Sequence, residues 1–424
     1  MPHPTPTTGE SADTNADPIP LTEPREGTPK VTTSRDSLTT YAQELARGSG
    51  PVAVDAERAS GFRYGQDAYL VQLRRDGAGT GLIDPQALPD LSVISQAVGE
   101  EEWVLHAADQ DLPCLADVGM APTRLFDTEL AGRLLNKRRV GLASLVAEEL
   151  GFSLAKEHSA ADWSTRPLPE EWLRYAALDV EVLVELRDVL AEQLEEAGKL
   201  EWAHQEFAAV LNAPAPAPRV EPWRRTSGSH AVRDRRQLAV LRSLWYARDR
   251  AARAADIAPG RILPDSAIVA AATAGTTDLR SLKAFRTPSG RRRLKIWTAA
   301  VKEAQQLPES DLPTRRPAQS TGLPQPRLWR DKSPDAASRL EAVKRIVRTR
   351  ALALDVPQEN LLTPEFQRRL AWEPPEPASD DHVAARLTEL GARPWQVTQL
   401  AGLLADAVGR PDHVIETLPD PLAK

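Results

Sequence analysis

Four acidic side chains and one tyrosine, spread over three short segments, constrain this 424-residue chain more than any other feature. They are Asp55 with Glu57, then Asp111, then Tyr175 with Asp179. The local pattern around each would turn its acidic group toward one shared point. Carboxylates that share a site repel one another and cannot all stay ionised without cations between them. The sequence therefore predicts a fold that gathers the three segments around a pair of divalent metal ions, which is equipment for phosphodiester cleavage.

The first pair follows an apolar run. Residues 51–55 predict a short buried strand, and alternate residues on a strand point to the same face. Asp55 and Glu57 can therefore reach the same metal ion. An Asp-x-Glu pair alone is common in acidic proteins, and a solvated strand end is the alternative interpretation.

The middle segment, 106–112, comes after another predicted strand at 102–106. Asp111 would lie in the first turn of a helix or just before it, where capping and the helix dipole also favour a carboxylate. Asp109 competes for either role. His106 ends the strand, and a histidine in the core is the alternative to a place at the site.

The third segment is the most informative. Tyr175 and Asp179 are four residues apart on a predicted helix at 170–197, so they share one face. A tyrosine hydroxyl beside a metal-bound carboxylate can orient an attacking water. The alternative is an ordinary amphipathic helix with a core tyrosine and a surface aspartate. Asp84 and Asp127 are interpreted as a turn residue and a helix cap.

Proline-rich stretches divide the chain into three predicted blocks. Strand patterns at 51–55, 68–73, 81–84 and 102–106, followed by helical patterns, predict an α/β fold with a mixed sheet for the first block. The second and third blocks lack strand patterns and predict small helical bundles. The expected division is a disordered tail 1–33, the first block 34–211, a linker 212–227, the second block 228–306, a linker 307–327, the third block 328–413 and a tail 414–424.

Charge is unevenly distributed between these blocks. Residues 36–212 carry 31 Asp and Glu against 15 Lys and Arg, whereas 219–302 carry 19 Lys and Arg and far fewer acids. Such asymmetry favours an acidic active domain joined to a module that holds a polyanion. The expected phosphate-holding residues are Arg233, Arg235, Arg236, Arg242, Arg291, Arg292, Arg293 and Lys295.

Composition also indicates the cellular compartment in which the protein is expected. Cys114 is the only cysteine, so an internal disulfide is excluded, which fits a reducing compartment. The sequence shows no secretory signal pattern and no apolar run long enough to span a bilayer. A cytoplasmic protein is expected.

The three acidic segments, in their order and spacing, resemble the three exonuclease motifs of the DEDD superfamily, and Tyr175 places the resemblance in the DEDDy branch. The run from Asp162 to Leu168 resembles ribonuclease D in particular. The second and third blocks are similar to HRDC domains, which ribonuclease D carries after its catalytic domain. The resemblance covers residues 34–413. It implies a ribonuclease H-like 3′→5′ exonuclease domain with a mixed sheet at 34–211, an HRDC domain at 228–306 and a second HRDC-like domain at 328–413.

The resemblance also implies a mechanism. Asp55, Glu57 and Asp179 would hold one Mg²⁺ or Mn²⁺ ion, and Asp55 would bridge to a second ion supported by Asp111. Tyr175 would orient the attacking water, and nucleoside 5′-monophosphates would be released stepwise from the 3′ end. The implied partner is RNA with a free 3′ end, such as a tRNA precursor, acted on by a monomer.

One position departs from the family pattern. In many relatives an apolar or aromatic residue follows the glutamate of the first motif, but here it is Arg58. Arg58 could contact a phosphate of the RNA or point into solvent, and His106 is expected near the site.

Other functions remain open from the sequence. A 3′→5′ DNA exonuclease would use the same carboxylates. A non-catalytic RNA-binding protein with a decayed nuclease fold, or a scaffold that acts through its HRDC-like blocks, are alternatives from another class. Retention of all five site residues argues against decay, and no helicase phosphate-binding loop is present.

Overall fold

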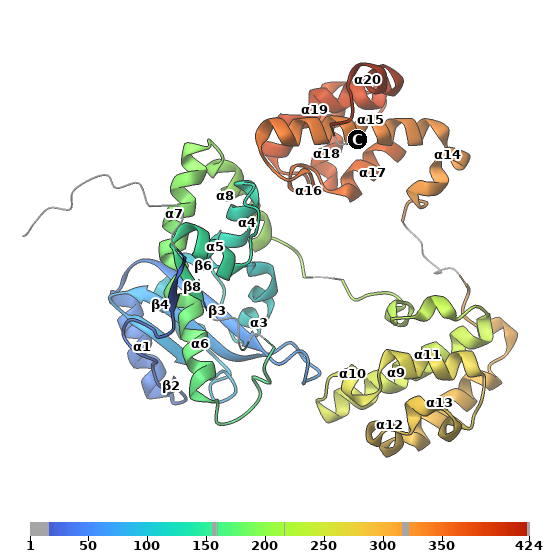
Figure 1. Ribbon diagram of the computed structural model, residues 1–424, viewed down its shortest axis with the longest axis horizontal. Helices are drawn as coiled ribbons and strands as arrows, with labels where there is room; N and C mark the ends of the chain where they lie inside the picture. The colour runs from blue at the N-terminus through green and yellow to red at the C-terminus, as the bar shows by residue number, and fades with distance from the viewer. Residues whose placement is uncertain (1–16, 155–157, 159, 216, 316–321, 422–424) are drawn as a thin grey trace, which may run out of the picture.

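The computed structural model describes residues 17–154, 158, 160–215, 217–315 and 322–421 (Figure 1). It contains an α/β block followed by two helical blocks, as the sequence predicts. No helix within these ranges is both long and apolar enough to cross a bilayer.

A six-stranded mixed sheet forms the centre of the first block, in the order β2-β5-β4-β3-β6-β7. The central strand β3 runs antiparallel to β4 and parallel to β6. Across the β3–β4 pair, Asp55 lies opposite Gln72 and Glu57 opposite Leu70. A separate two-stranded sheet pairs β1 with β8. The strands are β1 (Ile19–Leu21), β2 (Val31–Thr32), β3 (Ser49–Arg58), β4 (Ala68–Asp76), β5 (Gly79–Ile83), β6 (Glu102–Leu105), β7 (Arg124–Asp127) and β8 (Phe152–Leu154).

Helices pack against the sheet and bury its apolar side chains. Helix α6 contacts β3, β4 and β5, and its small residues Ala176 and Ala177 pack in one cluster with Leu70 and Leu82. The small side chains of Ala176 and Ala177 let this part of α6 lie close to the strands that carry Asp55 and Glu57. The helices of the block are α1 (Arg35–Arg47), α2 (Ser92–Val98), η1 (Ala108–Gln110), α3 (Leu112–Asp117), α4 (Thr128–Leu134), α5 (Leu142–Glu149), α6 (Glu170–Glu181), α7 (Leu183–Glu196) and α8 (Leu200–Leu211).

The prediction that residues 1–33 are disordered is wrong for residues 17–33. Although this segment has few apolar residues, its backbone groups pair with existing strand edges, β1 with β8 and β2 with β5. The Arg25 backbone N–H donates to Glu181 Oε1 at 3.4 Å and its guanidinium donates to Glu185 Oε2 at 2.9 Å. Arg174 of α6 also pairs with Glu23 at 3.2 Å. The segment therefore lies across α6 and α7, while residues 1–16 lie outside the described part.

Both later blocks contain helices and no strand among their described residues, as predicted. Four expected boundaries move. Trp223, placed in the first linker, is 1% exposed within the core of the second block, and that core also includes Leu312, past the expected end at 306. The third block begins with η7 at Pro326 and continues past residue 413 in α20. The second block comprises η2 (Pro222–Arg225), η3 (Ser229–Ala231), α9 (Arg235–Ala255), α10 (Pro259–Ile262), α11 (Asp265–Ala274), η4 (Leu279–Ser281), η5 (Lys283–Phe285), α12 (Pro288–Arg292), α13 (Leu294–Gln306) and η6 (Glu309–Asp311). The third comprises η7 (Pro326–Leu328), α14 (Trp329–Lys332), α15 (Pro334–Leu354), α16 (Gln358–Leu361), α17 (Pro364–Trp372), α18 (Asp380–Leu390), α19 (Pro394–Gly409) and α20 (Pro411–Thr417).

The second block contacts the loop that follows β3. The Tyr64 hydroxyl donates to Asp249 Oδ1 at 2.9 Å, and the Ala258 N–H donates to the Phe62 carbonyl at 2.9 Å. The guanidinium of Arg261 lies 4.0 Å from the centre of the Phe62 ring. This basic block is therefore attached beside the strand end that carries Asp55 and Glu57.

The third block contacts the C-terminal helix of the first. Trp202 and Trp395 stack with their ring centres 4.7 Å apart. Lys199 Nζ donates to the carbonyls of Leu134 and Asp355 at 2.9 and 2.8 Å, which links α4 to the turn after α15. Partial burial lowers the pKa of Lys199, and the nearby Asp355 opposes that effect.

Gly81 gives a test of how α1 packs on the sheet. A Cβ at Gly81 would lie 2.3 Å from ring atoms of Tyr41, whose hydroxyl donates to the Leu73 carbonyl at 3.1 Å. The ring cannot move aside without leaving that buried hydroxyl unpaired. We expect Gly81→Ala to lower the free energy of unfolding in urea by about 1–3 kcal/mol, the usual cost of overpacking.

The matched control is Gly61→Ala, where an added Cβ meets nothing within 4 Å. Its free energy of unfolding should stay within about 0.5 kcal/mol of the wild-type value. Equal effects of the two substitutions would contradict the described packing of Tyr41.

Candidate active site

Three of the predicted carboxylates meet at the end of β3. Asp55 and Glu57 project from one face of this strand toward α6, and α6 brings Asp179 to them. Their nearest carboxylate oxygens all lie within 4.8 Å of one another. The strand alternation and the close approach of α6 together produce this convergence.

Asp111 reaches the same cavity from the turn after β6. It is the N-cap residue of α3, yet its side chain accepts no capping hydrogen bond, so the capping alternative does not describe its role. Instead its carboxylate is largely buried and lies 3.4 Å from the guanidinium of Arg58. The competing candidate Asp109 is exposed and does not line the cavity.

The turn before Asp111 is held by Asp127. Ala107 adopts a left-handed conformation with φ of 57°, and the Ala107 and Ala108 N–H groups donate to the Asp127 carboxylate at 3.1 and 2.8 Å. The same carboxylate accepts from two N–H groups at the start of α4, which confirms the predicted cap. Asp127 therefore fixes two segments at once, a positioning role that the sequence did not reveal.

Tyr175 lies one turn before Asp179 on α6 and lines the cavity. Burial, reinforced by the negative charges of Asp179 and Glu57, raises the pKa of the Tyr175 hydroxyl. The ring of His158 meets the Tyr175 ring edge-on, with centres 5.9 Å apart. The neutral hydroxyl is placed to hydrogen-bond a water beside the carboxylates.

The cavity at this point has a volume of about 600 Å³ and lies in the size range of small-ligand sites. It combines an acidic floor with an apolar wall from α5, β8 and α7. Its lining residues are Asp55, Ala56, Glu57, Arg58, His106, Ala107, Gln110, Asp111, Leu142, Ala143, Leu154, Tyr175, Asp179 and Leu183.

Burial and mutual repulsion perturb the acids strongly. Burial raises the pKa of Asp55, and the pKa values of Glu57 and Asp179 lie well above their ordinary values because burial is reinforced by neighbouring carboxylates. The pKa of Asp111 is raised to about 8, mainly by burial and by Asp55. Gln72 is a neutral donor to Asp55, with its Nε2 3.3 Å from Asp55 Oδ2.

Such a group of acids fits divalent cations. The donor set is all oxygen and anionic, which suits Mg²⁺ or Mn²⁺ rather than softer metals. Among the lining residues that the structure describes, Arg58 is the sole Lys or Arg. One guanidinium is too little charge to balance four ionised carboxylates, so the residues present are suited to hold added cations.

His106 lines the cavity as expected but carries no charge there. Burial lowers the pKa of His106 to about 4, and its Nδ1 lies 2.9 Å from the Thr128 hydroxyl. The neutral imidazole forms part of the wall and packs toward the start of α4.

The other predicted RNA-binding residues fall into two groups. Arg235, Arg236 and Arg242 of α9 donate to backbone carbonyls of the segment 304–313. Much of their hydrogen-bonding capacity is therefore used within the second block. Arg233 is exposed and lies just before the N-cap residue of α9. The remaining four, Arg291, Arg292, Arg293 and Lys295, line a separate surface hollow.

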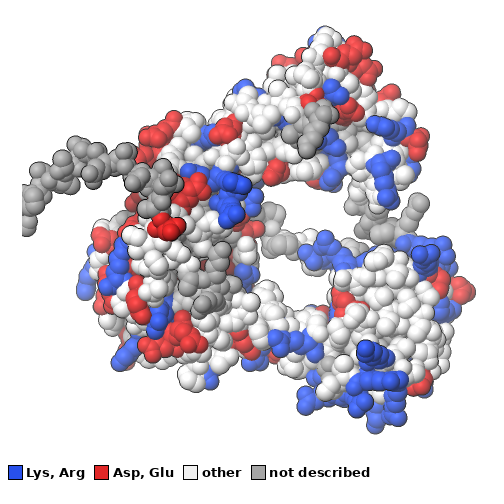
Figure 2. All heavy atoms as spheres, viewed as in Figure 1, with Lys and Arg blue, Asp and Glu red and all other residues white. Residues whose placement is uncertain are grey.

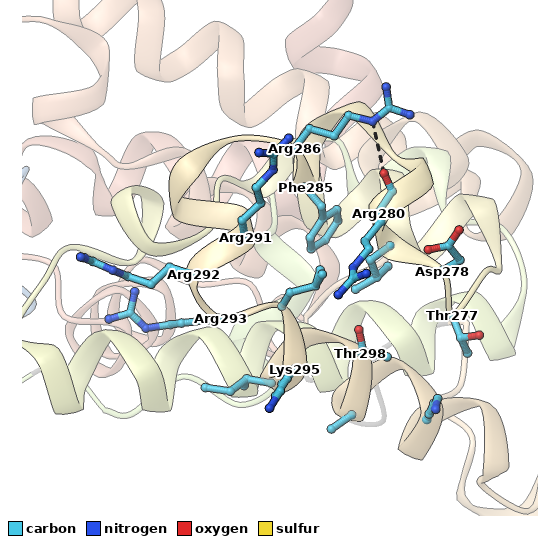
Figure 3. A pocket seen from close by; sticks show the side chains of 15 residues that line it. Thr277, Asp278, Arg280, Phe285, Arg286, Arg291, Arg292, Arg293, Lys295 and Thr298 are labelled. Atoms are coloured by element: carbon cyan, nitrogen blue, oxygen red, sulfur yellow. Dashed lines mark hydrogen bonds between the residues drawn. The ribbon is translucent and has the colours of Figure 1, made fainter.

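This basic hollow, as we call it, has a volume of about 1270 Å³ and lies between η4, η5, α12 and α13 (Figure 3). Asp278 is its one acidic lining residue. Lys and Arg gather visibly on this block in Figure 2, at the lower right. Its basic lining residues are Arg280, Arg286, Arg291, Arg292, Arg293, Lys295 and Lys302.

Arg166 was not predicted as a site residue, but it anchors the segment in front of α6. Its guanidinium donates to both carboxylate oxygens of Asp84, at 2.7 and 2.8 Å, and to the Tyr69 carbonyl at 2.8 Å. The sequence flagged the run 162–168 without showing which of its residues makes the anchor. Asp84 is a turn residue as interpreted, accepting from the Gln86 N–H, and is also the partner of this arginine.

The fold and the acidic site define a nuclease of the 3′→5′ exonuclease class. A family model described as 3′-5′ exonuclease matches residues 29–195, and an HRDC domain model matches 237–296. The third block matches a different model, described as 3′ to 5′ exonuclease C-terminal domain, over 322–408.

Comparison with individual relatives identifies the family within this class of nucleases. A ribonuclease D of Gluconacetobacter diazotrophicus is 32% identical over 313 residues, covering 71% of this chain and 78% of the relative. A crystal structure of a Bifidobacterium adolescentis protein is 40% identical with a TM-score of 0.82, covering 92% of this chain and 99% of that one. Escherichia coli RNase D, described as an exoribonuclease involved in structured RNA processing, is 28% identical with a TM-score of 0.62 over 85% of this chain and 98% of its own. The chain belongs to the ribonuclease D family.

The raised carboxyl pKa values predict how stability depends on pH without metal. In the unfolded chain the pKa of these acids is about 4, whereas in the folded protein burial raises the pKa of Asp111 to about 8. Between these values the folded state binds more protons than the unfolded state, so the free energy of unfolding falls as pH rises. Urea unfolding in EDTA at several pH values across this range measures the slope.

The variant Asp111→Asn should flatten that slope, because it removes one of the crowded acids. The control is Asp117→Asn, at the exposed end of the same helix α3, which should leave the slope unchanged. A wild-type stability that rises across the range would contradict the crowding of these acids.

Proposed function

We propose that this protein is a 3′→5′ exoribonuclease that removes nucleoside 5′-monophosphates stepwise from RNA 3′ ends. The observation that supports the proposal most is the meeting of Asp55, Glu57, Asp111 and Asp179 with Tyr175 in one cavity. Membership of the ribonuclease D family supports RNA as the substrate. The description of the Escherichia coli relative favours structured RNA, such as a tRNA precursor, as its natural form.

In the proposed reaction Asp55, Glu57 and Asp179 would hold one divalent ion, Mg²⁺ or Mn²⁺, and Asp55 with Asp111 would hold a second. When bound, such ions lower the pKa of a coordinated water and stabilise the negative charge of the leaving oxygen. Tyr175 donates or accepts a hydrogen bond at the attacking water and orients it toward the terminal phosphodiester. Asp127 and Gln72 act through other residues, by holding the Asp111 turn and the Asp55 carboxylate.

In this proposal the basic hollow binds a part of the RNA strand that is distant from the cleavage site. The acidic cavity repels phosphates unless cations are present, so binding energy has to come from elsewhere on the protein. The hollow offers seven basic side chains against one acid, and most of the seven are exposed. The second block is attached beside the end of β3, which supports a path for one strand from the hollow to the cavity.

A 3′→5′ DNA exonuclease remains the second candidate, because the same carboxylates serve either sugar. The basic second block and the family favour RNA. The monomeric state and the cytoplasmic location stay predictions, the latter supported by Cys114, a single buried thiol.

Replacing Asp55 tests the proposed activity. The variant Asp55→Asn keeps the side-chain volume but removes the charge shared between the two proposed ion positions. We expect its cleavage of a 3′-overhanging RNA in Mg²⁺ or Mn²⁺ to fall by roughly 10²-fold or more, the loss typical of removing one electrostatic stabiliser of a transition state. The products are resolved on a sequencing gel beside a matched DNA.

Asp109→Asn is the control, because Asp109 is exposed outside the cavity and should retain wild-type rates. Full activity of Asp55→Asn would remove the proposed metal site. Cleavage of the DNA but not the RNA by wild type would favour the second candidate, and cleavage of neither would favour a binding protein.

Salt dependence tests the basic hollow. Each phosphate contact on a single strand contributes about −0.7 to the slope of log affinity against log salt. The triple variant of Arg291, Arg292 and Arg293 to Gln should therefore bind single-stranded RNA more weakly and with a slope reduced by roughly 2. Fluorescence anisotropy in EDTA measures both quantities without cleavage.

The control pair Arg330→Gln and Lys332→Gln removes exposed positive charge from α14 in the third block. These substitutions should leave the slope near the wild-type value. A wild-type affinity that does not change with salt would overturn the role of the hollow.

A further inference from the structure

Arg58 is the feature of the site that neither the carboxylates nor the family pattern explains. It follows Glu57 at the end of β3, where strict alternation would turn it to the opposite face of the sheet. The pairing of β3 with β4 slips at this point: Glu57 lies opposite Leu70, but Arg58 lies opposite Ala68. With this irregularity in the strand, the guanidinium lies within the acidic cavity.

The guanidinium lies against one carboxylate of the four. Its Nη2 is 3.4 Å from Asp111 Oδ1, and the Arg58 side chain is 25% exposed, so it keeps one side open to the cavity. Asp111 does not belong to the group of three carboxylates whose oxygens lie within 4.8 Å of one another. The guanidinium of Arg58 is thus a positive charge placed beside Asp111, the carboxylate that lies outside that group.

A cation at this place has a consequence for added metal. A guanidinium stays charged at any ordinary pH. It therefore repels a divalent ion that approaches Asp111, while the three grouped carboxylates are left to receive an ion. The two proposed ion positions are consequently unequal as long as Arg58 remains on Asp111.

We propose that Arg58 occupies the place of the second metal ion in the free protein and transfers to a phosphate of the substrate when that ion binds. This inference rests on the proposed function, since it requires a metal site at these carboxylates. Phosphate is a suitable second partner because a guanidinium can form two parallel hydrogen bonds with it. The exchange couples binding of the second ion to binding of a nucleotide 3′ end, and Arg58 is the positioning residue that couples them.

Counting bound Mn²⁺ tests the exchange without any cleavage. The full-length protein is titrated with Mn²⁺, and free Mn²⁺ is measured by electron paramagnetic resonance with and without a nucleoside 5′-monophosphate. We expect the wild type to bind one ion tightly alone. The nucleotide should tighten the second ion by roughly 5–150-fold, the ordinary size of coupling between two sites.

The variant Arg58→Leu should bind two ions tightly without nucleotide, and the added nucleotide should tighten neither. Arg58→Gln, which keeps a polar side chain but is shorter and uncharged, guards against an effect of the apolar replacement and should behave likewise. Arg124→Gln is the control, because this exposed arginine begins β7 at the opposite end of the sheet from the cavity.

The possible outcomes distinguish failure of the Arg58 exchange from failure of the proposed metal site. Two equally tight ions in the wild type without nucleotide, or unchanged Mn²⁺ binding in both Arg58 variants, would overturn the exchange and leave the proposed activity standing. No Mn²⁺ bound by the wild type, with or without nucleotide, would overturn the proposed metal site and the exchange together.

Discussion

Mutual repulsion between buried carboxylates is the constraint on which the rest of this structure depends. Asp55, Glu57, Asp111 and Asp179 meet in a cavity where burial penalises each charge and each charge penalises the others. A fold keeps such an arrangement only if the surrounding chain holds it in place at a cost that other contacts offset. The large core packed on the sheet and the helices supplies that stability, and the carboxylates remain available for cations.

Polar anchors in the first block maintain this arrangement. Asp127 binds the turn that presents Asp111, and Arg166 ties the segment before α6 to Asp84 at the end of β5. The N-terminal segment pairs with β8 and contacts α6 from outside. Each anchor joins parts of the chain that are far apart in sequence. Together they fix the strand end, the turn and the helix that carry the acids.

The sequence was sufficient for the parts that follow from local periodicity. Alternation along β3 predicted that Asp55 and Glu57 share a face, and helical spacing predicted the same for Tyr175 and Asp179. The α/β block and the helical blocks follow from the same patterns and from the proline-rich breaks. The mixed sheet and its partner helices are confirmed by the structure and by the family comparisons.

The features that the sequence did not predict depend on tertiary contacts, which leave no local pattern in the sequence. Residues 17–33 look disordered because they have few apolar side chains, yet they are ordered by pairing with existing strand edges. Arg235 and Arg236 look like free phosphate ligands, but the end of the same block uses them for its carbonyls. The reach of Arg58 to Asp111 depends on a slip in strand pairing, which leaves no signal in a single sequence.

Anomalous diffraction from crystals soaked in Mn²⁺ and a nucleoside 5′-monophosphate tests the central claim most directly. The account predicts two anomalous peaks roughly 3.5–4 Å apart, one among Asp55, Glu57 and Asp179 and the other between Asp55 and Asp111. Peaks elsewhere on the protein, or no peak at these carboxylates, would contradict it.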